Sequence, residues 1–568
     1  MEVFMNKKIV SFSALLALSF LVTGCKGDSS VVSEEQPTDI PSTSGPQTEV
    51  TESVKPSDSY DSSWTPGEFA ISDAVQPEVK NPQGIYNNLG KMRRSQGREG
   101  LPQQGEGNLL VVPVEFADDL SNSIAIDESV RDSLNSAFFG EETSDKSLPS
   151  VKKYYQQSSY GTLSLDGVVA PTVTLSKEIS DYLVTALAQG TNVVISEIID
   201  EVYDALFDNS ETYYLPDFDS DDDGRIDGLV LAYSWPAADY FYGTSQYELI
   251  SSLLVNDVIS PKDFVGEAPV ASTFFTSSRI SQMTNVKNDS HIYIRGVGSL
   301  LGIDSYDDVK GNENTGLFRA PLAGLDIMDG NIQDHNPFTK YMMGWIDPQV
   351  ITPSSLNEDL EISLLSSAEA SDAVLLAPED TGLYGEYLLV DFYTPYGLNE
   401  VDVEYSYAYN PYGTSRKGLS EAGVRVYKVD SRLVEGKLGD YSMTEEEPDF
   451  DKTFVAKDGN TYSYQYDFAF SNDSVNEYQS SGIYETYPLV ELLSKRGANR
   501  HMVDYTVTFT NEDLFLEGDS FGDENGAYFY QDFRFDGDGY QGSSLDITFE
   551  VTSISSNEAT LKLRRKAA

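Results

Sequence analysis

The clearest pattern of potential metal ligands in the sequence lies between Asp219 and Asp227. This segment has acidic residues at loop positions 1, 3, 5 and 9 and a glycine at position 6. Calcium binds several hard oxygen ligands at once, and this spacing wraps carboxylates around one point while the glycine permits a sharp turn. We therefore predict a calcium site made of Asp219, Asp221, Asp223, Asp227 and the backbone carbonyl of Arg225.

The predicted calcium loop differs from an EF-hand. Its position 12, where an EF-hand has a bidentate glutamate, is Val230, and an apolar strand over 229–233 follows in place of a helix. A solvated acidic turn is the alternative interpretation. The segment 536–539, Asp-Gly-Asp-Gly, echoes part of the pattern, and we predict no ion there.

The histidines give little support to zinc chemistry. The chain contains three, His291, His335 and His501, and no two of them lie within four residues of each other. The H-E-x-x-H pattern, which places two histidines one helical turn apart, is therefore absent. A zinc site of His291, His335 and Asp304 has no support in their spacing, so we expect ordinary surface or core histidines. We also expect no serine or cysteine nucleophile and no phosphate-binding loop.

The single cysteine, Cys25, has a position that suggests lipidation. Lys7 and Lys8 precede an apolar stretch over 9–22, which is too short for an ordinary membrane-spanning helix. The stretch ends in Val22-Thr-Gly-Cys25, which is typical of a lipobox. We predict that residues 1–25 are a lipoprotein signal peptide and that Cys25 carries a lipid anchor on the extracellular side of a bacterial membrane.

Charge and composition limit the classes of partner that the protein can bind. With 38 basic and 92 acidic residues the formal net charge is −54, which repels nucleic acid and attracts cations such as calcium. We predict no nucleic-acid partner. The apolar fraction of 40% suffices to bury substantial cores, and 568 residues are too many for one ordinary core.

The composition changes along the chain in a way that predicts four regions. After the signal peptide, residues 26–84 are rich in Ser, Thr, Pro and acids, which indicates a disordered tether. Helical and strand patterns alternate over 85–350, whereas short strands dominate 351–568 and indicate a β-rich, sandwich-like region. Pro113 suggests an edge strand or a bulge. The main expected elements are strands at 109–116, 162–169, 229–233, 386–392, 424–429, 545–551 and 559–563, and helices at 151–157 and 194–206.

Several stretches resemble, in the same order, the immune inhibitor A family of secreted bacterial zinc metallopeptidases. The resemblance implies a zincin-like metallopeptidase domain, of α+β class, followed by the β-rich region. It covers about 93–348 well and the remainder loosely. The stretches are 108–116, 150–161, the acidic loop running into 227–230, the Met-turn-like Leu325-Asp-Ile-Met328, Lys340-Tyr-Met-Met-Gly-Trp345, and, farther on, 386–390 and 423–430.

The zinc motif of that family is degenerate in this chain. The matching segment places Arg295 at the first histidine, Gly296 at the catalytic glutamate and Ser299 at the second histidine. Gly302 matches the family's glycine, and Asp304 resembles the acidic third ligand after a one-residue deletion. We predict that Arg295 replaces the metal electrostatically by pairing with Asp304 or Asp307, and an Arg295 side chain that points to solvent is the alternative.

Three functions remain open. The first is a non-catalytic surface lipoprotein, a pseudopeptidase that binds extracellular protein or peptide. The second is an active metallopeptidase with a non-standard site, which family membership alone supports. The third is a calcium-stabilised structural or adhesive surface protein. Calcium is the expected cofactor, and we do not expect zinc.

Overall fold

The computed structural model describes the chain from Leu101 onward, with gaps. The described residues are 101–117, 125–141, 148–208, 215–220, 226–234, 253–255, 274–277, 290–303, 306, 321–329, 333–377, 386–404, 418–430, 434–435, 453–455, 461–463, 466–467, 476–480, 483–487, 490–496, 509–522 and 545–566. Within these residues no helix is long and apolar enough to cross a membrane.

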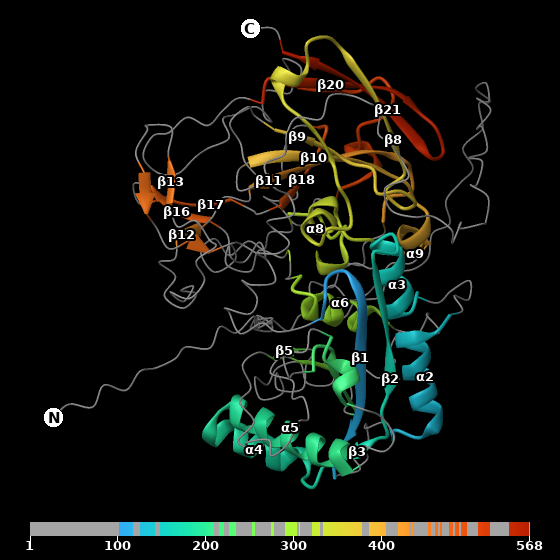
Figure 1. Ribbon diagram of the computed structural model, residues 1–568, viewed down its shortest axis with the longest axis vertical. Coiled ribbons are helices and arrows are strands. Elements are labelled where there is room, and N and C mark those ends of the chain that lie inside the picture. Colours follow the sequence, from blue (N-terminus) through green and yellow to red (C-terminus); the bar gives the residue numbers. More distant parts are fainter. Residues whose placement is uncertain are drawn as a thin grey trace, which may run out of the picture.

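A mixed sheet organises the first half of the protein (Figure 1). Its strand order is β2-β1-β4-β6-β5, with β3 also paired to β1. Every described pairing is parallel except that of β5 with β6. The strands are β1 (Gly105–Glu115), β2 (Leu163–Val169), β3 (Val173–Thr174), β4 (Leu229–Tyr233), β5 (Leu253–Val255) and β6 (Phe274–Ser277).

Pro113 lies in β1, between paired strands on both sides, so the expectation of an edge strand was wrong. The register explains why the proline is tolerated. Val111 pairs with Val169 of β2 and Val114 with Val173 of β3, so Pro113 faces the break between these two strands. The carbonyl oxygens of Val111 and Glu115 point to that side, and the missing N–H of Pro113 points the same way. No ladder hydrogen bond is therefore lost.

Helices cover both faces of this sheet. On one face lie α4 (Ile179–Gln189) and α5 (Thr191–Asp208), packed on the even-numbered residues of β1. On the other face lie α2 (Glu128–Phe139), α3 (Val151–Ser158) and α6 (His291–Leu300), packed on Leu109 and Val111. Because both faces of β1 are covered, the strand is a continuous apolar run instead of an alternating one.

The C-terminal part is a sandwich of two sheets. One has the order β18-β11-β10-β9-β7, and the other β19-β20-β21-β8. Buried side chains from both sheets share one core. The strands are β7 (Gln349–Ile351), β8 (Leu360–Leu365), β9 (Val374–Leu376), β10 (Glu386–Tyr393), β11 (Gly423–Asp430), β18 (Val490–Leu493), β19 (Ser520–Phe521), β20 (Ile547–Ile554) and β21 (Glu558–Arg565).

Smaller elements complete the described structure. Three separate strand pairs join β12 (Val434–Glu435) to β15 (Tyr466–Asp467), β13 (Thr453–Val455) to β14 (Thr461–Ser463), and β16 (Asn476–Ser480) to β17 (Ile483–Tyr487). The short helices are η1 (Leu215–Phe218), η4 (Ile327–Asp329), α8 (Pro337–Met342), η5 (Pro353–Ser355), η6 (Gly397–Asn399), α9 (Glu400–Glu404) and η8 (Asn511–Asp513).

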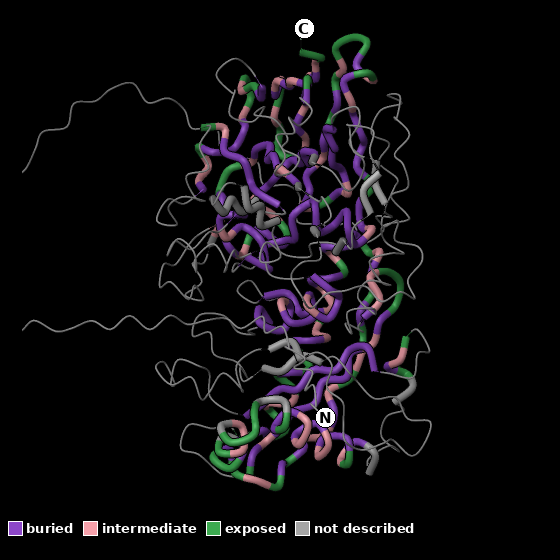
Figure 2. The backbone as a smooth tube through the Cα atoms, turned by 90° about the vertical axis from the view of Figure 1, so that its left-hand side faces the viewer, coloured by how far each residue is buried: buried purple, intermediate pink, exposed green. Residues whose placement is uncertain are grey.

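One hydrophobic core joins the two halves. It contains Leu109 of β1 and Val297 of α6 together with Tyr387 of β10 and Leu492 of β18. The inner sheet of the sandwich therefore packs on its other face against the body that carries α6. Figure 2 shows buried backbone continuing from the helical end of the molecule to the sandwich. The predicted mixed α and β class is confirmed, as are the sequence-predicted strands and both predicted helices, within a few residues at their ends.

Candidate functional site

Helix α6 carries Arg295, Gly296 and Ser299, the three positions that the sequence analysis predicts to be those of a degenerate zinc motif. Arg295 and Ser299 are partly exposed, and the other residues of the helix, Gly296 included, are buried. The two open positions lie one turn apart, and the hydroxyl of Ser299 is 3.5 Å from the carbonyl oxygen of Arg295. Residues four apart share one helix face, so the structure brings Arg295 and Ser299 together on the open stripe of an otherwise buried helix.

The end of α6 is fixed by Gly302. Its backbone φ of 90° is left-handed, which glycine adopts at little cost. The N–H of Gly302 bonds to Ser299 and that of Ile303 to Gly298, each at 2.9 Å, which is a Schellman termination. Asp304 and Asp307 lie outside the described residues, so their pairing with Arg295 stays a prediction.

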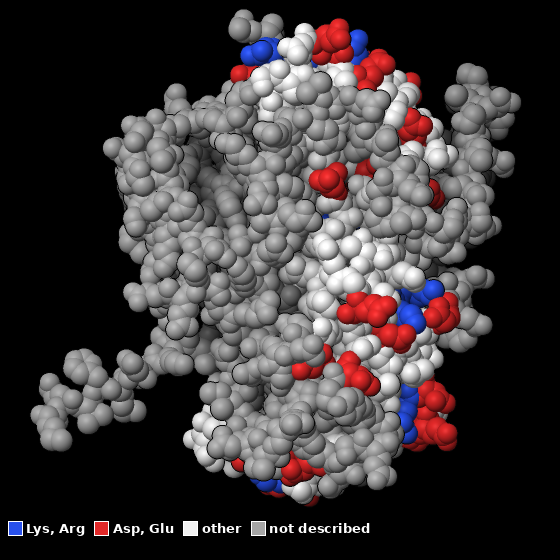
Figure 3. Space-filling view, viewed as in Figure 1, with Lys and Arg blue, Asp and Glu red and all other residues white. Residues whose placement is uncertain are grey.

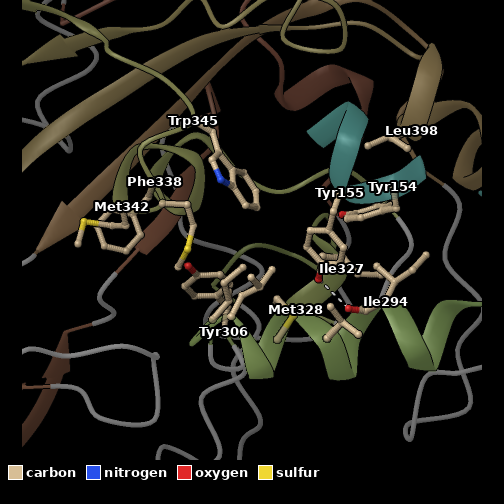
Figure 4. Close-up of a cluster of buried hydrophobic side chains, with 14 of the residues drawn as sticks. Tyr154, Tyr155, Ile294, Tyr306, Ile327, Met328, Phe338, Met342, Trp345 and Leu398 are labelled. Atoms are coloured by element: carbon tan, nitrogen blue, oxygen red, sulfur yellow. Dashed lines mark hydrogen bonds between the residues drawn. The ribbon is translucent and has the colours of Figure 1, made fainter. Parts of the chain in front are cut away.

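The buried side of α6 rests on a floor made by Met328 and Tyr155 (Figure 4). The hydroxyl of Tyr155 donates to the carbonyl oxygen of Ile294 at 2.7 Å. A Cβ on Gly298 would lie 2.9 Å from that hydroxyl and 3.0 Å from the sulfur of Met328. The segment that contains Met328 therefore packs directly against the buried side of α6, and Gly298 allows the close approach.

Asp326 holds this floor in place. One carboxylate oxygen accepts the N–H of Met328 at 2.7 Å, and the other accepts two 2.7 Å bonds from the backbone and side-chain nitrogens of Asn336. Asn336 in turn caps α8 by accepting the N–H groups of Phe338 and Thr339. Burial alone would raise the pKa of Asp326, but the neighbouring His335 ring and these N–H donors outweigh it and hold that pKa below its usual value.

His335 lies in the core, one of the two ordinary roles, surface or core, expected for the lone histidines. Its ring is fully buried among Tyr154, Tyr155 and Trp345, with ring centroids 5.6 to 5.9 Å away. Its Nδ1 is 3.9 Å from Asp326, too far for a direct hydrogen bond. His291 is also buried, as the first residue of α6, and His501 lies outside the described residues.

The structure describes only the two ends of the predicted calcium loop. Asp227 is buried, and its carboxylate accepts the N–H of Ser220 at 2.6 Å. Its own N–H bonds to the carbonyl oxygen of Phe218 at 2.9 Å. These bonds close the base of a loop directly before β4. Asp219 is partly exposed, whereas the predicted ligands Asp221, Asp223 and Arg225 lie outside the described residues.

Among the described residues no three His, Cys, Asp or Glu side chains gather as a metal site would require. This bears on neither the calcium loop as a whole nor a site that includes Asp304, because those segments are described only in part. Cys25 and the predicted tether also lie outside the described residues.

The letters of the G-x-S-x-G pattern do occur, at Gly518–Gly522, but their setting is not that of a catalytic serine. A nucleophile elbow places its serine between a strand and a helix. Ser520 instead lies within β19, which pairs antiparallel with β20. Its side chain is exposed on the strand. The expectation of no serine nucleophile thus stays a prediction that this local structure supports.

Sequence reasoning missed a buried polar cluster next to the floor. Lys340 is 2% exposed, and its Nζ is 2.5 Å from Asp334, 2.8 Å from the hydroxyl of Tyr160 and 3.4 Å from the carbonyl oxygen of Ser367. Asp334 also accepts the hydroxyl of Ser158 at 2.6 Å. A signal was available, since Lys340 is the only charge between Pro337 and Ile346.

No family model matches the chain, and no curated protein matches it.

Proposed function

We propose that this chain is a cell-surface lipoprotein whose metallopeptidase-like body binds extracellular protein or peptide without hydrolysing it. The observation that carries the proposal is the pair Arg295 and Ser299 on the open stripe of α6. These positions correspond to the zinc-binding histidines in the resemblance to immune inhibitor A peptidases, and Gly296 corresponds to the general base.

The side chains at these positions do not suit zinc-dependent hydrolysis. Zinc needs deprotonated nitrogen, sulfur or carboxylate ligands, whereas a guanidinium has no acceptor and repels a cation. Glycine offers no group that could accept a proton from water. A change at any one position could be compensated, but all three are altered together.

Several features support a zincin-like body. Helix α6 lies against β5 and β6, and Met328 of the Met-turn-like segment lies beneath it. Strand β5 is the last in the described sheet order and runs antiparallel to β6. An extended peptide that adds to such a strand gains backbone hydrogen bonds, and pockets for alternate side chains supply selectivity. Binding without cleavage therefore needs no metal at α6.

The described surface charge agrees with an extracellular, non-nucleic-acid role. Several described lysines pair with acids: Lys152 and Lys153 pair with Glu141 at 3.4 and 2.8 Å, and Lys177 pairs with Glu197 at 2.7 Å. Figure 3 shows acidic side chains spread over one face of the molecule, with basic ones beside some of them. Such pairing leaves little net positive potential to attract phosphates.

The test is to measure zinc content and peptide cleavage in the purified full-length protein. We expect less than stoichiometric zinc and no cleavage, together with saturable binding of a peptide selected from an extended-peptide library. Arg295→Ala should cost about 1–3 kcal/mol if the predicted pairing with Asp304 or Asp307 forms. One equivalent of zinc with cleavage by the unaltered protein would establish the active-peptidase alternative. Absence of any peptide binding would favour the structural or adhesive one.

The lipid anchor is tested separately. Cys25→Ser, expressed in a bacterial host beside the unaltered chain, should abolish labelling by a fatty-acid probe, because no other cysteine exists. Equal labelling of the two proteins would remove the anchor from the proposal and leave the peptide-binding part untouched.

A further inference from the structure

We propose that the C-terminal sandwich holds Met328 and Tyr155 in place against α6. The sandwich and the body, meaning the described residues before 350, would then unfold locally as one cooperative unit. The sequence predicts a boundary at 350–351, yet three independent sets of contacts cross it. The inference holds whether or not the α6 face binds a peptide.

The first set is apolar. The inner sheet of the sandwich has two buried faces. Val390 and Val426 point into the sandwich core, whereas Leu389 and Tyr427 belong to the core that contains α6. A sheet with both faces covered in this way cannot lose the body without exposing a row of aliphatic and aromatic side chains to water.

The second set is the buried polar cluster around Lys340, which draws its partners from both sides. Asp334, Tyr160 and Lys340 come from the body, and Ser367 comes from the segment between β8 and β9. The hydroxyl of Tyr160 donates to the carbonyl oxygen of Ser367 at 2.6 Å. Tyr160 adopts a left-handed φ of 54°, which a residue with a Cβ adopts only when its surroundings enforce it. Separation of the halves would leave this strained tyrosine and the Lys340 ammonium without the Ser367 carbonyl.

The third set links the floor itself to the inner sheet. The N–H of Leu492 in β18 donates to the carbonyl oxygen of Pro321 at 2.9 Å. Pro321 begins the segment that turns through Ala323, with a left-handed φ of 58°, and reaches Asp326 and Met328. The segment beneath α6 is thus held between the helix and the sandwich sheet. Loss of the sheet would free the segment that positions Met328.

The experiment is native-state hydrogen exchange on the full chain with a cavity made in the outer sheet of the sandwich. Phe549 in β20 stacks on Phe521 at 5.1 Å and belongs to the core that lies between the two sheets. If the halves open together, Phe549→Ala should speed the exchange of α6 amides by the same factor as that of β20 amides, about tenfold or more. Val551→Ala makes a smaller cavity in the same core and serves if Phe549→Ala does not fold.

Ser553→Ala is the matched control, because Ser553 is exposed on the same strand and should leave both exchange rates unchanged. The proposal is overturned if β20 amides exchange faster in the cavity variants while α6 amides keep their original rate. That result would show two independently opening domains with a boundary near 350. It would leave the proposed binding function standing, since peptide affinity is measured on the unaltered protein.

Discussion

Lys340 carries its positive charge into the interior of the protein, where it must be compensated. Burial lowers the pKa of Lys340, and the carboxylate of Asp334 restores part of the loss. The ring of Tyr160 lies 4.3 Å from the ammonium and adds a cation–π contact. A second buried pair, Arg425 with Asp391 at 2.5 Å, lies close enough to influence this charge. Such pairs add little net stability over apolar packing, but they are costly to break.

We predict that Lys340→Met destabilises the protein by about 3–5 kcal/mol, because it leaves the Asp334 carboxylate buried without its cation. Lys562→Met is the matched control. Lys562 pairs with Asp359 at 3.1 Å near the surface, and its loss should leave the free energy of unfolding almost unchanged, because exposed ion pairs contribute little. Urea unfolding of the three proteins measures both values.

A double variant sharpens this test. Adding Asp334→Asn to Lys340→Met removes the orphaned charge, so the double variant should be more stable than the sum of the two single changes predicts. Equal costs for Lys340→Met and Lys562→Met would contradict the buried position of Lys340.

At the scale of elements, helix α6 shows how a close contact constrains a sequence. Glycine is a poor helix former, and alanine at Gly298 would gain about 1 kcal/mol of helix propensity. That gain is opposed by contacts of 2.9 and 3.0 Å with Tyr155 and Met328. The Tyr155 hydroxyl cannot yield easily, because it is held by the carbonyl oxygen of Ile294.

We therefore predict that Gly298→Ala lowers stability by about 1–2 kcal/mol, since overpacking outweighs propensity. Ser299→Ala, one residue further on the partly exposed side, should be neutral or slightly stabilising and serves as control. In a Tyr155→Phe background, the added methyl should cost less, because the clashing hydroxyl is gone. Thermal unfolding of the four variants decides the matter, and additive costs would argue against the described contact.

The second element with a testable role is the acidic loop before β4. An ion that binds only the folded state stabilises it by about 2.7 kcal/mol at a hundredfold excess over its dissociation constant. Thermal unfolding should therefore shift upward with added calcium and downward with a chelator. Asp221→Ala combined with Asp223→Ala should remove most of this response.

The weaker acidic echo provides the control for calcium. Asp536→Ala with Asp538→Ala removes the same number of charges from a segment where we predict no ion. The response to calcium should survive this change. If the first pair of substitutions leaves the response intact, the ion binds elsewhere.

The sequence could predict most of the helices and strands but little of how their side chains pack in the interior. Strand 229–233 and helix 151–157 were recognisable because local periodicity encodes them. The same periodicity cannot report which face of a strand meets a distant element. Pro113 suggests an edge strand or a bulge from sequence alone, because the break between β2 and β3 that accommodates it depends on long-range register.

In the candidate site, too, sequence reasoning singled out some residues and missed others. Residues 295, 296 and 299 were singled out only by the resemblance to the immune inhibitor A family, and their correspondence to a zinc motif stays a prediction. Helical spacing explains only why 295 and 299 share one face of α6. The cluster of Lys340, Asp334 and Tyr160 was not predictable, because its members are separated by up to 180 positions along the chain. Contacts at such separation leave only indirect traces, such as a lone lysine among apolar residues.

At the scale of the whole molecule, the main core is rich in tyrosine. Burial raises the pKa of Tyr154, Tyr155, Tyr160 and Tyr427 well above the usual value, and it raises those of Tyr233 and Tyr393 as well. Tyr233 belongs to the core that contains α4 and α5, whereas Tyr427 and Tyr155 both belong to the core that joins the body to the sandwich. A phenolate in this core would face buried carboxylates such as Asp326, so the folded protein keeps these groups protonated.

The direction of the resulting pH dependence follows from linkage. A group whose pKa is raised in the folded state contributes fully below its unfolded value, about 10 for tyrosine. Above that pH the unfolded chain releases protons that the folded chain retains, and each such tyrosine costs about 1.4 kcal/mol per pH unit. Lys340 acts in the opposite sense, because its pKa is lowered on folding and its buried charge is relieved as pH rises. The tyrosines outnumber it, so stability should fall steeply above pH of about 10.

We predict that urea unfolding measured at a series of alkaline pH values shows this loss, with the phenolate absorbance of the buried tyrosines appearing together with unfolding. Tyr427→Phe gives the decisive comparison, because its hydroxyl is buried with no hydrogen-bond partner in the described structure. Near neutral pH the substitution should be neutral or stabilising, since it removes an unsatisfied polar group. Above pH of about 10 it should reduce the slope of stability against pH by one group's share. The phenolate absorbance that Tyr427→Phe removes reports on Tyr427 alone among the 36 tyrosines of the chain. If that share rises with an ordinary tyrosine pKa while the protein remains folded, the Tyr427 ring is open to solvent.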